Sequence, residues 1–134
     1  FILIGLQWPV EAINRRINKR VKAMFFPNTV DPTLAQSVVP AGESLQDETK
    51  RLYEAGSLGD QAAQALGYKQ VISFLEGRST LDDAFERTKI LTRRYAKQQR
   101  TWLRRFGQVH WLSAPDRSAS ELADESATIV SAYI

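Results

Sequence analysis

Between Phe85 and Phe106 mostly apolar residues recur at steps of three or four, and this spacing predicts one long helix over residues 80–106. The repeat places its members on one face, which we expect to be buried. Ser79 or Thr80 can cap the start of the helix, and Gly107 can end it. The face predicted to be buried comprises Phe85, Thr88, Leu91, Tyr95, Gln99, Trp102 and Phe106.

Before this helix the pattern changes three times. The continuous apolar run of residues 1–6 is typical of a strand covered on both faces. Helical spacing follows, and it predicts a helix over residues 9–24 with Pro9 in its first turn. Residues 25–43 hold three of the five prolines and show no sustained period, so we predict a long Pro-rich loop or insertion.

The remaining segments complete a mainly helical fold. Residues 44–77 are interpreted as short helices, with Ser44 and Asp47 as a capping box and a break near Gly67. A short strand is predicted at residues 109–112 and a tail helix at residues 119–134. At 134 residues we expect a single domain, or a fragment of one.

Charge is concentrated in the long helix. Between Arg87 and Arg105 there are eight Lys or Arg residues and no Asp or Glu. Without these eight, the chain would keep ten basic residues against fifteen acidic ones, a net charge of −5 instead of +3. The basicity is therefore local, and it lies on one predicted element.

The cations and aromatics of this helix suit RNA. Arg93, Lys97, Arg100 and Arg104 follow one another at steps of four, three and four, a stripe that can follow a phosphate backbone. Trp102 lies among them, and aromatic rings stack on unpaired bases. Three other interpretations remain: a solvated cationic face over an ordinary core, a helix that binds a protein partner, and a helix that lies on a membrane surface.

Composition excludes several kinds of site. The chain has no cysteine and a single histidine, which excludes disulfides, thiolate metal sites and histidine clusters. No apolar run approaches the ~20 residues needed to span a bilayer, so we expect a cytoplasmic protein without membrane contact. Because the chain starts at Phe1 on a strand-like run, we also expect a missing upstream segment.

Two motifs resemble the C-terminal half of bacterial tRNA dimethylallyltransferases: AAQALGYKQ at residues 62–70 and TRRYAKQQRTWLRR at residues 92–105. INRRINKRVKAM, LQDETKRL and VHWL support the resemblance in the same order. It covers nearly the whole chain outside the Pro-rich loop and the tail. The fold that it implies is the helical C-terminal portion of an α/β P-loop-type, nucleotide-kinase-like enzyme, with one or two short strand remnants.

The resemblance also implies an activity. The family transfers a dimethylallyl group from dimethylallyl diphosphate to the exocyclic amine of the adenosine 3′ to the tRNA anticodon. Its phosphate-binding loop and its catalytic aspartate belong to an N-terminal half that is absent here, so this fragment alone should not catalyse the transfer. Mg²⁺ is implied for the full-length enzyme, but no ligand for it is identifiable in this chain.

Roles for individual residues follow from the resemblance and from the basic stripe. Arg20 matches the arginine of the family's R-V-x-x-M segment, which implies contact with the diphosphate as the one catalytic residue present. The partner implied is the tRNA anticodon stem-loop. The residues that we expect to contact tRNA are Gln64, Gly67, Tyr68, Lys69, Arg93, Arg94, Lys97, Gln99, Arg100, Thr101, Trp102 and Arg104.

The chain also departs from the family. The family usually has arginine where Gln98 stands and an apolar residue where Arg100 stands, and its connection at residues 25–43 is shorter. The leading hypothesis is thus the C-terminal half of a tRNA prenyltransferase, which supplies tRNA contacts and part of the substrate channel. The alternative is a stand-alone helical RNA-binding module without catalysis.

Overall fold

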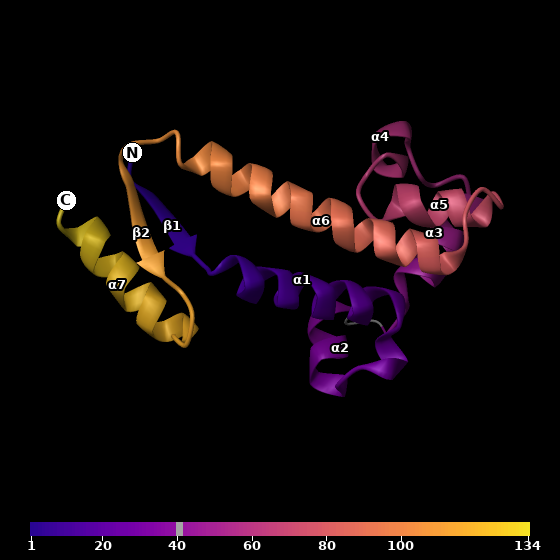
Figure 1. Cartoon of the computed structure of the whole chain (residues 1–134), viewed down its shortest axis with the longest axis horizontal. Coiled ribbons are helices and arrows are strands. Elements are labelled where there is room, and N and C mark those ends of the chain that lie inside the picture. Colours follow the sequence, from indigo (N-terminus) through magenta and orange to yellow (C-terminus); the bar gives the residue numbers. More distant parts are fainter. Residues whose placement is uncertain (40–41) are drawn as a thin grey trace. The chain divides into compact units, whose positions relative to one another are not determined.

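The computed structural model describes residues 1–39 and 42–134 and is mainly helical, with two short strands (Figure 1). The fold class predicted from the sequence is confirmed. A single 3₁₀ turn, Pro27–Thr29, follows α1. The elements are β1 (Leu3–Gln7), α1 (Val10–Phe25), α2 (Pro32–Val38), α3 (Leu45–Glu54), α4 (Asp60–Ala63), α5 (Tyr68–Leu75), α6 (Leu81–Leu103), β2 (Val109–Ser113) and α7 (Ala119–Ser131).

Contacts divide the chain into two compact units. The first, here called the strand unit, comprises Phe1–Asn14 and Ala96–Ile134. The second, here called the helical unit, is Arg15–Tyr95. The boundaries fall within α1 and α6, so each of these helices contributes residues to both units.

In the strand unit, β1 and β2 form a parallel pair in which Leu3 lies opposite Val109 and Gln7 opposite Ser113 (Figure 1). Parallel strands need a long crossover connection, and here the whole segment between residues 7 and 109 supplies it. Just after β2, the Ala114 N–H donates to the Gln7 carbonyl oxygen at 2.9 Å and extends the pairing. The single histidine, His110 of β2, meets the hydroxyl of Tyr133 at 3.1 Å.

The helical unit has a core to which α1, α3, α5 and α6 all contribute. Each of these helices places at least one buried side chain in the same cluster, because each has an apolar stripe at helical spacing. Phe25, at the end of α1, packs edge-on against Phe85 of α6 with ring centroids 5.6 Å apart. The buried members of the cluster are Val21, Phe25, Leu45, Val71 and Ala84.

The prediction of a loop over residues 25–43 is wrong for much of that segment. Helix α2 begins there because the Asp31 carboxylate accepts the backbone N–H groups of Thr33 and Leu34, at 2.9 and 3.3 Å. Pro32 takes the first helical position, where its missing N–H costs nothing. The Asp-Pro pair was the signal for this helix, and its short length hid the helical period. At Pro40 and Ala41 the loop prediction lies outside the described residues.

The predicted buried face of the long helix is confirmed only in its first half. Thr88 is 2% exposed and Phe85 packs against the core, whereas Tyr95 and Trp102 are 57% and 56% exposed. Gln99 is exposed as well. The physical reason is that the residues that α6 gives to the core cluster of the helical unit, Leu81, Ala84 and Phe85, all lie in its first turns.

The start of α6 is capped by Thr80 and not by Ser79. The Thr80 hydroxyl accepts the Asp83 N–H at 3.1 Å, and the Asp83 carboxylate accepts the Thr80 N–H at 3.0 Å. The Thr80 side chain also donates to this carboxylate, and these bonds hold the pKa of Asp83 below its ordinary value. Thr80 and Asp83 therefore cap the helix reciprocally.

Replacing Thr80 with alanine is expected to lower the free energy of unfolding by about 1 kcal/mol, the usual effect of losing a Thr N-cap. Because the pKa of Asp83 is depressed in the folded state, its contribution is present at neutral pH and is lost as the pH falls through that lowered value. Urea denaturation at neutral and acid pH measures the first effect. An NMR titration should show the pKa of Asp83 rising in T80A.

Ser79→Ala is the matched control, because Ser79 is the other residue that could have capped the helix. Its hydroxyl donates to the Ser73 hydroxyl at 3.3 Å, a weak contact away from the helix start. We expect this variant to change stability by less than about 0.5 kcal/mol. An equal loss of stability in both variants would contradict the assignment of Thr80 as the cap.

Candidate nucleic-acid interface

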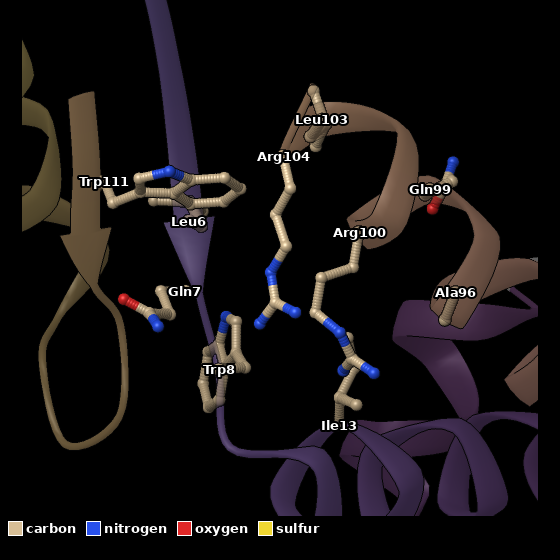
Figure 2. Close-up of a pocket in the computed structure, with 10 residues that line it drawn as sticks. All are labelled: Leu6, Gln7, Trp8, Ile13, Ala96, Gln99, Arg100, Leu103, Arg104 and Trp111. Atoms are coloured by element: carbon tan, nitrogen blue, oxygen red, sulfur yellow. The ribbon is translucent and has the colours of Figure 1, made fainter. Parts of the chain in front are cut away.

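A pocket of about 190 Å³ lies wholly within the strand unit, between the end of β1 and the last turns of α6. Ten residues line it, and all are labelled in Figure 2. The carboxyl end of β1 carries Leu6, Gln7 and Trp8 to one side, and β2 adds Trp111. Parallel strands commonly present ligand sites at their carboxyl ends, which makes this pocket the candidate site of the unit.

Two arginines extend into the pocket, Arg100 from the last turn of α6 and Arg104 from the position directly after the end of that helix. Figure 2 shows the guanidinium groups of Arg100 and Arg104 pointing away from the helix toward Trp8 and Ile13. They share one side because they are four positions apart and the Arg104 N–H still donates to the Arg100 carbonyl oxygen at 3.2 Å, which continues the helical turn. No Asp or Glu is among the lining residues, and no salt bridge to either arginine occurs within the described residues. The pocket is therefore positively charged, and it suits an anion.

The indole of Trp111 can lie against β1 because Gly5 has no side chain. These two residues are direct partners in the parallel ladder. A Cβ at Gly5 would lie 2.7 Å from Cζ3 of Trp111 and 2.8 Å from Cε3, closer than atoms pack. Glycine in a strand often marks such a close approach, and here it lets the ring lie against the backbone.

Other residues predicted to contact tRNA also lie on the part of α6 that belongs to the strand unit. Lys97, Thr101 and Trp102 are exposed, and the Thr101 hydroxyl donates to the Lys97 carbonyl oxygen at 3.0 Å. Trp102 stacks edge-on with Phe106, with ring centroids 4.7 Å apart, and still exposes 56% of its surface. Gln99 is exposed and also lines the pocket. A cation and an aromatic ring are thus both open to a ligand.

Two predicted contacts on α6 belong to the helical unit. Arg93 donates from Nε to Oδ1 of Asn18 at 3.0 Å, so its guanidinium joins α6 to α1 within that unit. The charge of Arg93 is not neutralised, because the acceptor is an amide. This hydrogen bond does, however, fix the position of the guanidinium between α6 and α1. Arg94, its neighbour, is exposed. Of this pair, Arg94 is the one that can move toward a ligand.

The turn at Gly67 depends on its backbone conformation. Gly67 has φ of +102°, a value that favours glycine, and its N–H donates to Oε1 of Gln70 at 2.8 Å. It is buried, and a Cβ there would lie 3.2 Å from Cδ2 of Leu45. In this structure Gly67 shapes the start of α5, and its backbone faces the core. The exposed members of the motif are Gln64 and Lys69.

Tyr68 is tied to α3. Its hydroxyl donates to Oε1 of Glu48 at 2.8 Å, and this bond, followed by partial burial, raises the pKa of Tyr68. The phenol is therefore neutral at physiological pH and serves to join α5 to α3. Lys69 follows it with an exposed ammonium group.

Arg20 lies on α1 in the helical unit and is exposed. Within the described residues it forms no ion pair with an acidic side chain. Its guanidinium is available to an anion such as a diphosphate. The structure thus gathers Gln99, Arg100 and Arg104 at one pocket, while Arg20 and the Gly67 turn belong to the other unit.

Sequence reasoning predicted three of the ten lining residues as contacts, Gln99, Arg100 and Arg104, and missed the other seven, Trp8 and Trp111 among them. The available signal was the position of Trp8 directly after a predicted strand, where ligand sites often lie in parallel sheets. Nothing in the sequence showed that β2 would pair with β1, and only that pairing brings Trp111 to Gly5.

The residues described do not fit a metal ion. No group of three or more His, Cys, Asp or Glu side chains among residues 1–39 and 42–134 is placed to hold one. In the same residues, no helix is both long enough and apolar enough to cross a membrane.

In its sequence the chain is similar to enzymes that modify tRNA. The family model described as IPP transferase matches residues 1–106. A tRNA dimethylallyltransferase of Staphylococcus epidermidis is 33% identical over 127 residues, which are 95% of this chain and 33% of the relative. That of Geobacillus kaustophilus is 39% identical over 114 residues, 85% of this chain and 31% of the relative. The chain thus spans about a third of the length of these curated relatives.

Solved structures give the same result. The full-length tRNA isopentenylpyrophosphate transferase of Bacillus halodurans matches with a TM-score of 0.76 and 30% identity, over 98% of this chain and 38% of that protein. A tRNA isopentenylpyrophosphate transferase of S. epidermidis matches with a TM-score of 0.77 and 31% identity, over 99% of this chain and 38% of that one.

Proposed function

The chain belongs to the IPP transferase family, and from this premise we propose that it is the C-terminal part of a tRNA dimethylallyltransferase. In this proposal it supplies tRNA contacts and part of the substrate channel. The chain spans about a third of its relatives, and in this proposal the phosphate-binding loop and the catalytic aspartate belong to a segment upstream of Phe1.

One observation carries the proposal that this part binds RNA: the cationic end of α6. Arg100 and Arg104 extend into a pocket without acidic lining residues, and Lys97 and Trp102 are exposed on the same helical turns. Cations positioned beside an exposed ring favour binding to RNA with unstacked bases. The exposed Lys69 and Gln64 add a second group of polar contacts from the helical unit.

The proposed reaction is a substitution at carbon. The exocyclic nitrogen of the adenosine bonds to C1 of the dimethylallyl group, and the bond from C1 to the diphosphate oxygen breaks. The diphosphate leaves with the electron pair, and the amine loses one proton to the upstream aspartate. Arg20 contributes by binding the leaving diphosphate, whose negative charge grows as the bond breaks.

The complete gene product tests this proposal. It should transfer the prenyl group from dimethylallyl diphosphate to tRNA, measured by mass spectrometry of the nucleosides after digestion. Arg20→Gln should lower kcat by about 100-fold, the usual effect of removing one donor to a developing negative charge. Lys22→Gln is the matched control, because Lys22 is an exposed cation of the same helix that lies in no predicted site.

The transferase proposal and the role of Arg20 can each be overturned. A complete gene product that lacks an upstream phosphate-binding loop, or that leaves tRNA unmodified, would exclude the transferase. Equal losses of kcat in R20Q and K22Q would exclude the role of Arg20. Binding of tRNA without any transfer would favour the alternative, a helical RNA-binding module.

A further inference from the structure

The pocket of the strand unit combines two kinds of group that recognise different parts of one ligand. Arg100 and Arg104 bring guanidinium groups, which can donate two parallel hydrogen bonds to a phosphate. Arg100 is only partly exposed, so its attraction for an anion is screened less than that of an open surface cation.

The second group is the indole of Trp111. One side of the ring lies on Gly5 of β1, where a Cβ would clash with it. The ring still exposes 37% of its surface and lines the pocket. A ring fixed in this way loses little conformational freedom when a planar group stacks on it. Leu6 and Leu103 complete an apolar surround for such a group.

The size of the pocket limits the ligand. Its volume of about 190 Å³ is below the roughly 300 Å³ at which pockets for drug-sized molecules begin. This size suits one ring system with a phosphate beside it better than a base pair or a folded peptide. The ligand is therefore a small planar group that carries negative charge.

We propose that this pocket binds a single nucleotide, with its base against Trp111 and its phosphate on Arg100 and Arg104. The inference rests on the proposed function only for the source of the nucleotide, which is one residue of the bound RNA. A free mononucleotide has the same chemistry, and the experiment separates the two sources.

Adenosine 5′-monophosphate is the probe, titrated into the complete gene product by calorimetry. It should bind more tightly than adenosine or inorganic phosphate, because only the whole nucleotide engages both the ring and the cations. Arg100→Gln and Arg104→Gln should each weaken its binding by about tenfold. Arg105→Gln, which removes an equal charge from an exposed residue outside the pocket, should change it by less than about twofold.

Trp111 gives an independent test. Trp111→Leu should weaken binding of the probe by about tenfold through loss of stacking. Trp111→Phe keeps an aromatic face and should restore most of the affinity. If Trp111 had only a structural role, binding of the probe would not depend on whether the side chain is aromatic.

An anticodon stem-loop RNA that competes with the probe identifies RNA as the source of the nucleotide. An RNA that binds without competing identifies a free mononucleotide. Equal losses in R104Q and R105Q, or an unchanged affinity in W111L, would overturn the proposal.

Failure here and failure of the proposed function are distinguishable. Prenyl transfer by the complete gene product with no effect of the pocket variants on nucleotide binding would reject the pocket alone. Nucleotide binding that depends on Arg100, Arg104 and Trp111, without prenyl transfer, would reject the transferase alone.

Discussion

Replacing Phe25 with alanine is expected to lower the free energy of unfolding of the helical unit by about 3–5 kcal/mol, the usual range for a buried Phe. Phe25 is 3% exposed, and it packs against Phe26 and Phe85 with ring centroids 6.1 and 5.6 Å away. Its removal leaves a cavity where α1 and α6 meet in the core of that unit. Urea denaturation followed by circular dichroism measures the loss.

Tyr95→Ala is the matched control for this prediction. The sequence pattern places Tyr95 on the buried face of the long helix, but the structure leaves it 57% exposed. We therefore expect a change of less than about 0.5 kcal/mol. A loss in Y95A as large as that in F25A would show that the whole predicted face is buried, against the structure.

The second large effect is expected on RNA binding. Replacing both Lys97 and Arg104 with alanine should weaken binding of the complete gene product to tRNA by about tenfold or more at low salt. Each lost phosphate contact also makes the negative slope of log K against log salt shallower by about 0.7–0.9. The slope of the double variant should therefore be shallower by about 1.5. Filter binding over a range of salt concentrations measures both quantities.

A double variant of equal charge serves as control. Arg87 and Lys22 are exposed, lie in the helical unit and are not among the predicted tRNA contacts. R87A/K22A should keep the salt slope of the parent protein, because screening limits the effect of charges that touch no phosphate. Equal changes in both double variants would mean that net charge, and not the end of α6, determines affinity.

The elements of this fold are largely readable in the sequence because their signals are local. The helical repeat of α6 and the capping residues at its start depend only on neighbours a few positions away. The apolar run at β1 likewise needs no distant partner to be recognised. Helix α2 was missed because its seven residues are too short to display a period.

Burial along α6 could not be read in the same way. Periodicity reports which residues share a face, but not whether another element covers that face. The core cluster takes α6 residues no further along than Phe85, so Tyr95 and Trp102 are exposed despite the correct spacing.

The candidate site, too, could be read only in part from the sequence. The amino-acid sequence by itself determined the cations of α6, the family motifs and the absence of cysteine, because these are properties of composition and spacing. Only the tertiary structure decided that Gly5 seats Trp111 beside Arg100 and Arg104, because a contact between residues about a hundred positions apart depends on the parallel pairing of β1 with β2. It likewise decided that Gly67 faces Leu45, since the exposure of a backbone turn depends on the helix that packs over it.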